Sequence, residues 1–163
     1  MQPEPAVVFV RRVTEPDFGA LELWRGHFLE WRGKTKLPDG EEAAVIIPVV
    51  DDDVPADDTL GFLTAASRAT FRRIVDDEAK VRRLVCHREL GMAQSWAASG
   101  DLPELDAESF AASLRTDSYY IYADKDGVSI EIWFEDTMDI FAGHVFCATY
   151  DGEGELQDVA LMS

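Results

Sequence analysis

The side chains best suited to chemistry or recognition lie close together in residues 133–144. This stretch contains Trp133, Glu135, Asp136, Asp139 and His144. An aromatic side chain among carboxylates can anchor a protein partner, because the ring supplies buried contact area and the acids supply complementary charge. The alternative is a structural hairpin in which His144 bonds a neighbouring carboxylate and Gly143 permits a tight approach or bulge. The residues alone leave both interpretations open.

A second group of acids forms the clearest linker in the chain. Asp51, Asp52 and Asp53 are followed closely by Asp57 and Asp58. Oxygen ligands of this kind could hold a hard cation weakly, but adjacent aspartates on a linker are more typical of a solvated segment. We therefore interpret Asp51, Asp52 and Asp53 as auxiliary contacts to a basic partner and predict no metal there.

The remaining motifs for metal binding do not reach the required spacing. His27, His87 and His144 are separated by more than any local metal-ligand spacing, and no Cys-x-x-Cys pair is present. Residues 124–135 begin and end like a calcium loop, but Ser129 stands where that loop needs glycine. A hairpin turn explains the segment better. We predict no metal and no cofactor.

No catalytic spacing is evident either. Cys86 and His87 are adjacent, but neighbours on a helix point about 100° apart, so no nucleophile–base pair is implied. Cys86 and Cys147 each lie in an apolar stretch, which predicts buried, reduced thiols. A pocket between helices and sheet near His144 and Cys147 remains the alternative that would suit an enzyme or a small-ligand binder.

Charge is unevenly divided along the chain. Residues 99–163 contain 15 acidic side chains against Arg115 and Lys125, whereas residues 1–98 are nearly balanced, and the whole chain carries −17. This charge disfavours nucleic acid and anionic membranes as partners. It suits a basic protein, whose encounter rate clustered carboxylates would raise. We expect the acids of the last third to form one anionic face.

The elements that position these residues are predicted by hydrophobic period. Residues 7–50 have the pattern of an antiparallel meander, in which Val7, Val8, Phe9 and Val10 form a short buried run in an edge or capping strand and residues 27–31, with Phe28, form a further strand. Residues 58–114 have a helical period, with Asp106 as the cap of the last helix and one buried stripe that consists of Leu60, Leu63, Ser67, Thr70 and Ile74 beside Phe71. Residues 118–162 alternate as a second meander, in which Ile130, Ile132 and Phe134 point inward. The sequence therefore predicts one α+β domain over residues 1–163, an antiparallel sheet with the central helical segment packed on one face.

Residues 1–10 lack the basic start and the long apolar run of a secretory signal, and no apolar run approaches a membrane span. We expect a cytoplasmic protein.

The chain resembles a family of small, uncharacterised bacterial α+β domains over most of residues 17–162. The matching segments are Phe18-Gly19-Ala20-Leu21, Trp31-Arg32-Gly33, Glu108-Ser109-Phe110 and the acidic, aromatic, Gly-His strand of residues 133–144. Such proteins place a second aromatic before Gly-His, where this chain has Ala142. The resemblance implies no reaction. By analogy of size and charge it is similar to immunity proteins of bacterial toxin systems.

The leading hypothesis is thus a non-enzymatic, acidic antidote that occludes a basic toxin domain. A homodimer joined through an exposed sheet edge is the alternative from a different class.

Overall fold

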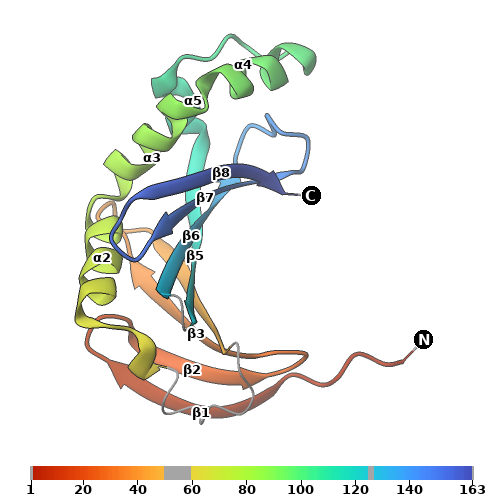
Figure 1. The fold of residues 1–163 in the computed structure, drawn as a ribbon. Helices are drawn as coiled ribbons and strands as arrows, with labels where there is room; N and C mark the ends of the chain where they lie inside the picture. Colours follow the sequence, from red (N-terminus) through yellow and green to blue (C-terminus); the bar gives the residue numbers. More distant parts are fainter. Residues whose placement is uncertain (1, 50–59, 125–126, 163) are drawn as a thin grey trace.

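In the computed structural model, which describes residues 2–49, 60–124 and 127–162, the chain forms an α+β fold (Figure 1). The first meander consists of β1 (Val8–Glu15), β2 (Gly19–Arg25), β3 (Leu29–Lys36) and β4 (Glu42–Val49). A 3₁₀ turn η1 (Leu60–Phe62) leads into α2 (Ala65–Asp76), α3 (Glu78–Arg88), α4 (Leu90–Ser99) and α5 (Ala107–Ser113). The second meander consists of β5 (Leu114–Asp124), β6 (Gly127–Asp136), β7 (Val145–Asp151) and β8 (Leu156–Met162).

Within the described residues the two meanders join into one eight-stranded sheet whose strands follow chain order from β1 to β8. Every neighbouring pair is antiparallel except β4 and β5, where Val45 lies opposite Tyr119. A parallel pair needs a long crossover connection, and the helical segment supplies it. The sequence predicts the two meanders, but it does not predict the parallel β4–β5 pair that joins them.

The core lies between the sheet and the helices, all of which pack on one face (Figure 1). Strand residues alternate, and the buried member of each pair points to the helices: Leu21 and Leu23 on β2, Val45 and Ile47 on β4. On β6 the predicted inward set of Ile130, Ile132 and Phe134 is confirmed. The helical stripe predicted from the sequence is also buried, with Phe71 packing edge-on against Tyr119 at a centroid separation of 5.6 Å.

Local capping explains where the helices begin. The hydroxyl of Thr64 accepts a hydrogen bond from Ser67 N at the start of α2. Asp106 and Ser109 form a reciprocal capping box at the start of α5, which confirms Asp106 as the predicted cap.

The arginines of α2 and α3 form ion pairs and hydrogen bonds with groups close to these helices. Arg68 pairs with Glu15 and Asp17 near the β1–β2 turn, at 2.7 and 3.3 Å. Arg73 donates to the backbone oxygen of Glu153 in the β7–β8 turn. The basic residues of these helices are expected from the sequence to form helix-surface ion pairs and to dock against the acidic sheet. The ion pairs are confirmed at Arg72–Asp76, Arg82–Glu78 and Arg88–Glu89. Toward the sheet, the arginines pair with acids of the first meander and reach backbone oxygens of the second.

Two sequence expectations about the first meander are wrong. Val7, Val8, Phe9 and Val10 are exposed by 43–54%, not buried, because β1 is an edge strand whose start runs along the rim of the sheet. Phe28, expected within a strand, lies in the β2–β3 turn and is 78% exposed. The expected edge strand is confirmed, but an apolar run does not by itself show that its side chains are buried.

Candidate functional site

The face of the sheet opposite the helices carries no helix in the described residues (Figure 1). We call it the helix-free face. Cross-strand pairing places one row of side chains across it, consisting of Arg12, Glu22, Arg32, Ile46, Tyr120, Glu131, Thr149 and Asp158. The β1–β3 end of this row alternates Arg12, Glu22 and Arg32, the β6–β8 end carries the carboxylates Glu131 and Asp158, and Ile46 and Tyr120 lie between them.

The second meander places an aromatic cluster with one carboxylate on this face. It consists of Tyr120 and Tyr122 on β5 and Glu131 and Trp133 on β6, and we call it the Glu131 cluster. The rings of Tyr120 and Trp133 lie 4.9 Å apart at 31°, and those of Tyr120 and Tyr122 lie 6.3 Å apart and nearly parallel. The residues share a face because Tyr120 pairs with Glu131 in the β5–β6 register.

Hydrogen bonds fix the carboxylate within this cluster. Trp133 Nε1 donates to Glu131 Oε1 at 3.0 Å, and Tyr122 Oη donates to the same oxygen at 3.5 Å. Burial, and secondly the Glu131 charge, raises the pKa of Tyr122 to about 12. The phenol therefore stays protonated at neutral pH and remains a donor. All four side chains are half-buried, so the cluster is ordered yet open to a partner.

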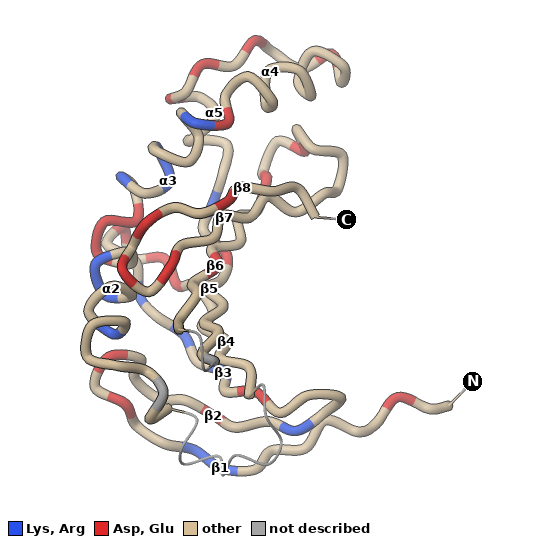
Figure 2. The backbone as a smooth tube through the Cα atoms, viewed as in Figure 1, with Lys and Arg blue, Asp and Glu red and all other residues tan. Residues whose placement is uncertain are grey.

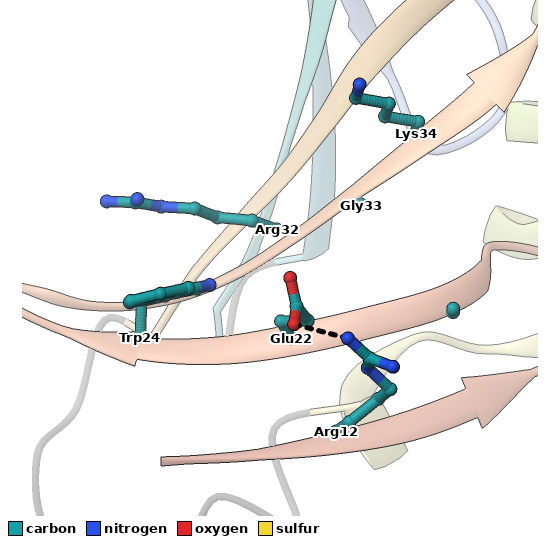
Figure 3. A pocket seen from close by; sticks show the side chains of 7 residues that line it. Arg12, Glu22, Trp24, Arg32, Gly33 and Lys34 are labelled. Carbon is teal, nitrogen blue, oxygen red and sulfur yellow. Dashed lines mark hydrogen bonds and ion pairs between the residues drawn. The ribbon is translucent and has the colours of Figure 1, made fainter. Parts of the chain in front are cut away.

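The first meander forms an open depression of about 590 Å³ beside this cluster, lined in part by Arg12, Glu22, Trp24, Arg32 and Lys34 (Figure 3). Arg12 pairs with Glu22 at 2.8 Å, and the Arg32 guanidinium lies 5.6 Å from the centre of the Trp24 ring. Arg32 also pairs with Glu30 of β3 at 2.7 Å, and Lys34 lies 3.8 Å from the carboxylate of Glu42 on β4. Because each cation has a carboxylate partner in the sheet, the depression is not a free anion site.

The structure separates the predicted site residues into two groups. Trp133 and Glu135 point from β6 onto the helix-free face, where Glu135 pairs with Arg115 across the β5–β6 register. Asp136, Asp139 and His144 lie instead at the end of β6 and in the loop that leads to β7.

That loop is held by its own polar groups. Asp136 accepts hydrogen bonds from the backbone nitrogens of Met138 and Phe141, at 3.2 and 2.9 Å. Asp139, at a positive φ of 54°, accepts one from Gly143 N. The His144 ring packs edge-on against Trp96 of α4 at 5.5 Å. These contacts give the three residues a structural role and leave Trp133 and Glu135 as the predicted residues nearest the Glu131 cluster.

The expected single anionic face is not what the structure has. Acidic positions of the second meander and of the chain leading to it lie at the β7–β8 turn, on β8, around α5 and at the β6–β7 loop (Figure 2). Glu131, Glu135 and Asp158 point onto the helix-free face, whereas Asp106 caps α5 and Asp136 and Asp139 turn back onto the β6–β7 loop, so these acids do not share one face. Asp51, Asp52 and Asp53 lie outside the described residues.

The thiols are poorly suited to chemistry. Cys86 and Cys147 are buried and not joined to each other, as predicted. Burial raises the pKa of each to about 12, so the reactive thiolate is scarce at neutral pH. Depressions near α3, α4 and α5 are lined by side chains other than His144 and Cys147.

The described residues contain neither a candidate metal cluster nor a helix suited to crossing a membrane. Histidine, cysteine and acidic side chains do not come together there in a group of three that could hold a metal ion. None of the helices in that part of the chain is long and apolar enough to span a bilayer.

Sequence reasoning missed Tyr120, Tyr122 and Glu131 as site residues. The alternation of β6 placed Glu131 outward beside Trp133, which was a usable signal. No comparable sequence signal marked Tyr120 and Tyr122. Which face of the sheet they point to depends on the bulge between Thr116 and Ser118, which shifts the β5–β6 register.

Comparison with known proteins gives a family but no characterised relative. No curated protein and no solved structure matches the chain. The family described as "Uncharacterized protein conserved in bacteria (DUF2262)" matches residues 15–161, and the chain therefore belongs to that family.

Proposed function

We propose that this protein is a non-catalytic binding protein for a basic protein partner, and that it binds through the helix-free face around the Glu131 cluster. The observation that carries the proposal is the cluster itself. Three half-buried aromatic rings surround a carboxylate on a sheet face that no described helix covers. Such rings supply the anchoring area of protein interfaces.

Charge supports a cationic partner. The chain carries −17, so a partner of opposite sign is attracted from a distance and one of like sign is repelled. On the face itself, Glu131 and Asp158 lie on either side of Thr149 in the cross-strand row. Electrostatic complementarity of this kind acts mostly on the association rate and on specificity.

The most concrete form of the proposal is a cytoplasmic, immunity-type antidote that occludes a basic toxin domain. Occlusion needs contact area and slow dissociation but no catalytic group, which agrees with the scarcity of thiolate at Cys86 and Cys147. Asp51, Asp52 and Asp53 remain proposed auxiliary contacts.

The test begins with capture of partners from a lysate of the native bacterium, followed by measurement of association rates with the purified partner. We expect a basic partner whose association rate falls at least about tenfold between about 50 and about 500 mM NaCl. We also expect Trp133→Ser to accelerate dissociation. Leu84→Ser is the matched control, because Leu84 is 57% exposed but lies on α3.

A partner that is acidic, or a basic partner insensitive to both salt and Trp133→Ser, would contradict the proposal. The immunity form fails separately if the captured partner has a toxic activity that an equimolar amount of this protein leaves intact.

A second candidate function, assembly through the sheet edge, is favoured by a different observation. Val7, Val8, Phe9 and Val10 are four consecutive exposed apolar residues at the start of edge strand β1 (Val8–Glu15) and just before it. Unprotected edges of this kind pair readily with another strand. Sedimentation velocity separates the candidates, since a strictly monomeric protein at micromolar concentration excludes this assembly.

A further inference from the structure

The Glu131 cluster has a more specific chemistry than a general apolar anchor, because it combines aromatic rings with a carboxylate that is only partly used. Within the described residues, the hydrogen bonds from Trp133 and Tyr122 both end on Oε1 of Glu131, and none ends on Oε2. The carboxylate is thus held through one oxygen, and the other accepts no hydrogen bond from the described residues. A half-buried carboxylate oxygen of this kind favours a cationic donor.

The rings beside it provide the second half of a cation site. Tyr120 lies against Trp133 at 31° and is nearly parallel to Tyr122, so the three rings line one continuous aromatic surface. Cations are attracted to the faces of such rings, most strongly to tryptophan. Arginine is better suited than lysine, because its planar guanidinium stacks on a ring while its N–H groups bond a carboxylate.

Several cross-strand neighbours of the cluster have short side chains. Ser118 pairs with Trp133 and Ser129 with Tyr122, while Thr149 faces Glu131 from β7. These neighbours are small. The cluster also lies on two central strands of the sheet, which hold its side chains more rigidly than a loop would.

We propose that Glu131, with Tyr120, Tyr122 and Trp133, forms a receptor for one arginine side chain of the basic partner. The guanidinium donates to Oε2 of Glu131 and stacks on the ring surface. This inference rests on the proposed function and names the group that the helix-free face recognises.

The cross-strand row also explains the position of the receptor. Toward β1 the row carries Arg12, Glu22 and Arg32, and both arginines are already paired with carboxylates, whereas toward β8 it carries Glu131 and Asp158 with no cation in the row. A partner arginine is therefore directed to the Glu131 side of Ile46. The receptor lies at the end of the row whose carboxylates have no cation beside them in the row.

The probe is a synthetic peptide of alternating arginine and glycine, compared by titration calorimetry with lysine–glycine and citrulline–glycine peptides of equal length. We expect the arginine peptide to bind the full chain more tightly than the lysine peptide. The citrulline peptide, which keeps the shape but lacks the charge, should bind at least about tenfold more weakly.

Two variants locate the site, and a third controls for general charge. Glu131→Gln and Trp133→Leu should each weaken binding of the arginine peptide about tenfold. Glu135→Gln, on the same strand and face but already paired with Arg115, should change it less than about twofold. Thermal unfolding of each variant shows that the fold is retained.

The inference is overturned if Glu131→Gln and Glu135→Gln weaken binding equally, or if the lysine peptide binds as tightly as the arginine peptide. A dimer that buries the cluster would overturn it as well. If a captured basic partner requires Trp133 but ignores Glu131→Gln, the arginine receptor fails while the proposed function stands. If no basic partner binds at all, the proposed function fails.

Discussion

At the scale of single residues, the described polar groups are mostly tied into the fold, and Glu78 shows how. Its side chain is 6% exposed, and its Oε1 accepts hydrogen bonds from Arg82 at 2.9 Å and from Thr116 at 2.8 Å. Arg82 in turn donates to the backbone oxygen of Ala111 at 2.6 Å. This network joins α3, α5 and β5, so Glu78 is a structural carboxylate and not part of a binding face.

Removing the cation from this pair should be costly. Arg82→Met leaves the Glu78 carboxylate buried with only Thr116 as donor, and we expect the free energy of unfolding to fall by about 3 kcal/mol. Arg12→Met is the matched control, since the Arg12–Glu22 pair is exposed at 65% and 34% and should change stability by less than about 1 kcal/mol. Urea unfolding measures both variants; equal losses would contradict the distinction.

The residues of the candidate site were predictable only in part, and the reason is register. Trp133 and Glu135 could be placed outward on β6 because alternation within one strand is local. Their neighbours Tyr120 and Tyr122 come from β5, and a bulge there decides what they face. Asp136 and Asp139 belong to the same sequence motif but turn their carboxylates back onto the β6–β7 loop. Sequence proximity therefore overestimated the number of site residues.

At the scale of elements, glycines show how closely the strands and helices are fitted. Gly33 on β3 has no room for a side chain, because a Cβ there would lie 2.6 Å from a methyl carbon of Leu21 and 2.9 Å from the backbone oxygen of Ala20. Gly91 on α4 is exposed, and nothing lies within 4 Å of its Cβ position. The same substitution should therefore have opposite effects at the two positions.

We expect Gly33→Ala to destabilise the protein by about 1–3 kcal/mol, because a backbone atom cannot move aside cheaply. Gly91→Ala should stabilise it by about 0.5–1 kcal/mol, since alanine loses less backbone freedom in a helix. Thermal unfolding of the two single variants measures the contrast. Stabilisation by Gly33→Ala would show that β2 and β3 are less tightly packed than described.

The elements themselves were largely predictable, because their periods are strong. The buried stripe of α2 and the alternation of β6 follow directly from the order of apolar residues. The burial of Val7, Val8, Phe9 and Val10 was mispredicted, because an apolar run is buried only if other elements cover it. Their place in an edge strand was expected and is confirmed, but nothing local to these residues shows that no other element covers their side chains.

At the scale of the whole molecule, charge and shape make different contributions. The net charge of −17 is a property of composition, and it supports attraction of a cationic partner at long range. The arrangement of the acids does not form the one anionic face expected from their order in the chain (Figure 2). Specificity must then come from a local site, and the Glu131 cluster combines a carboxylate, unpaired with any cation in the cross-strand row, with an aromatic surface.

The proposed receptor is tested most directly by NMR, which follows the indole N–H signals of the four tryptophans while the arginine–glycine peptide is added. Trp133 lies in the proposed receptor. Trp31 of β3 is fully buried in the core, and Trp96 of α4 packs against His144. We expect the Trp133 signal to shift most, and we expect added salt to reverse the shift. A largest shift at Trp31 or Trp96, or no shift at Trp133 under conditions where the peptide binds, would contradict it.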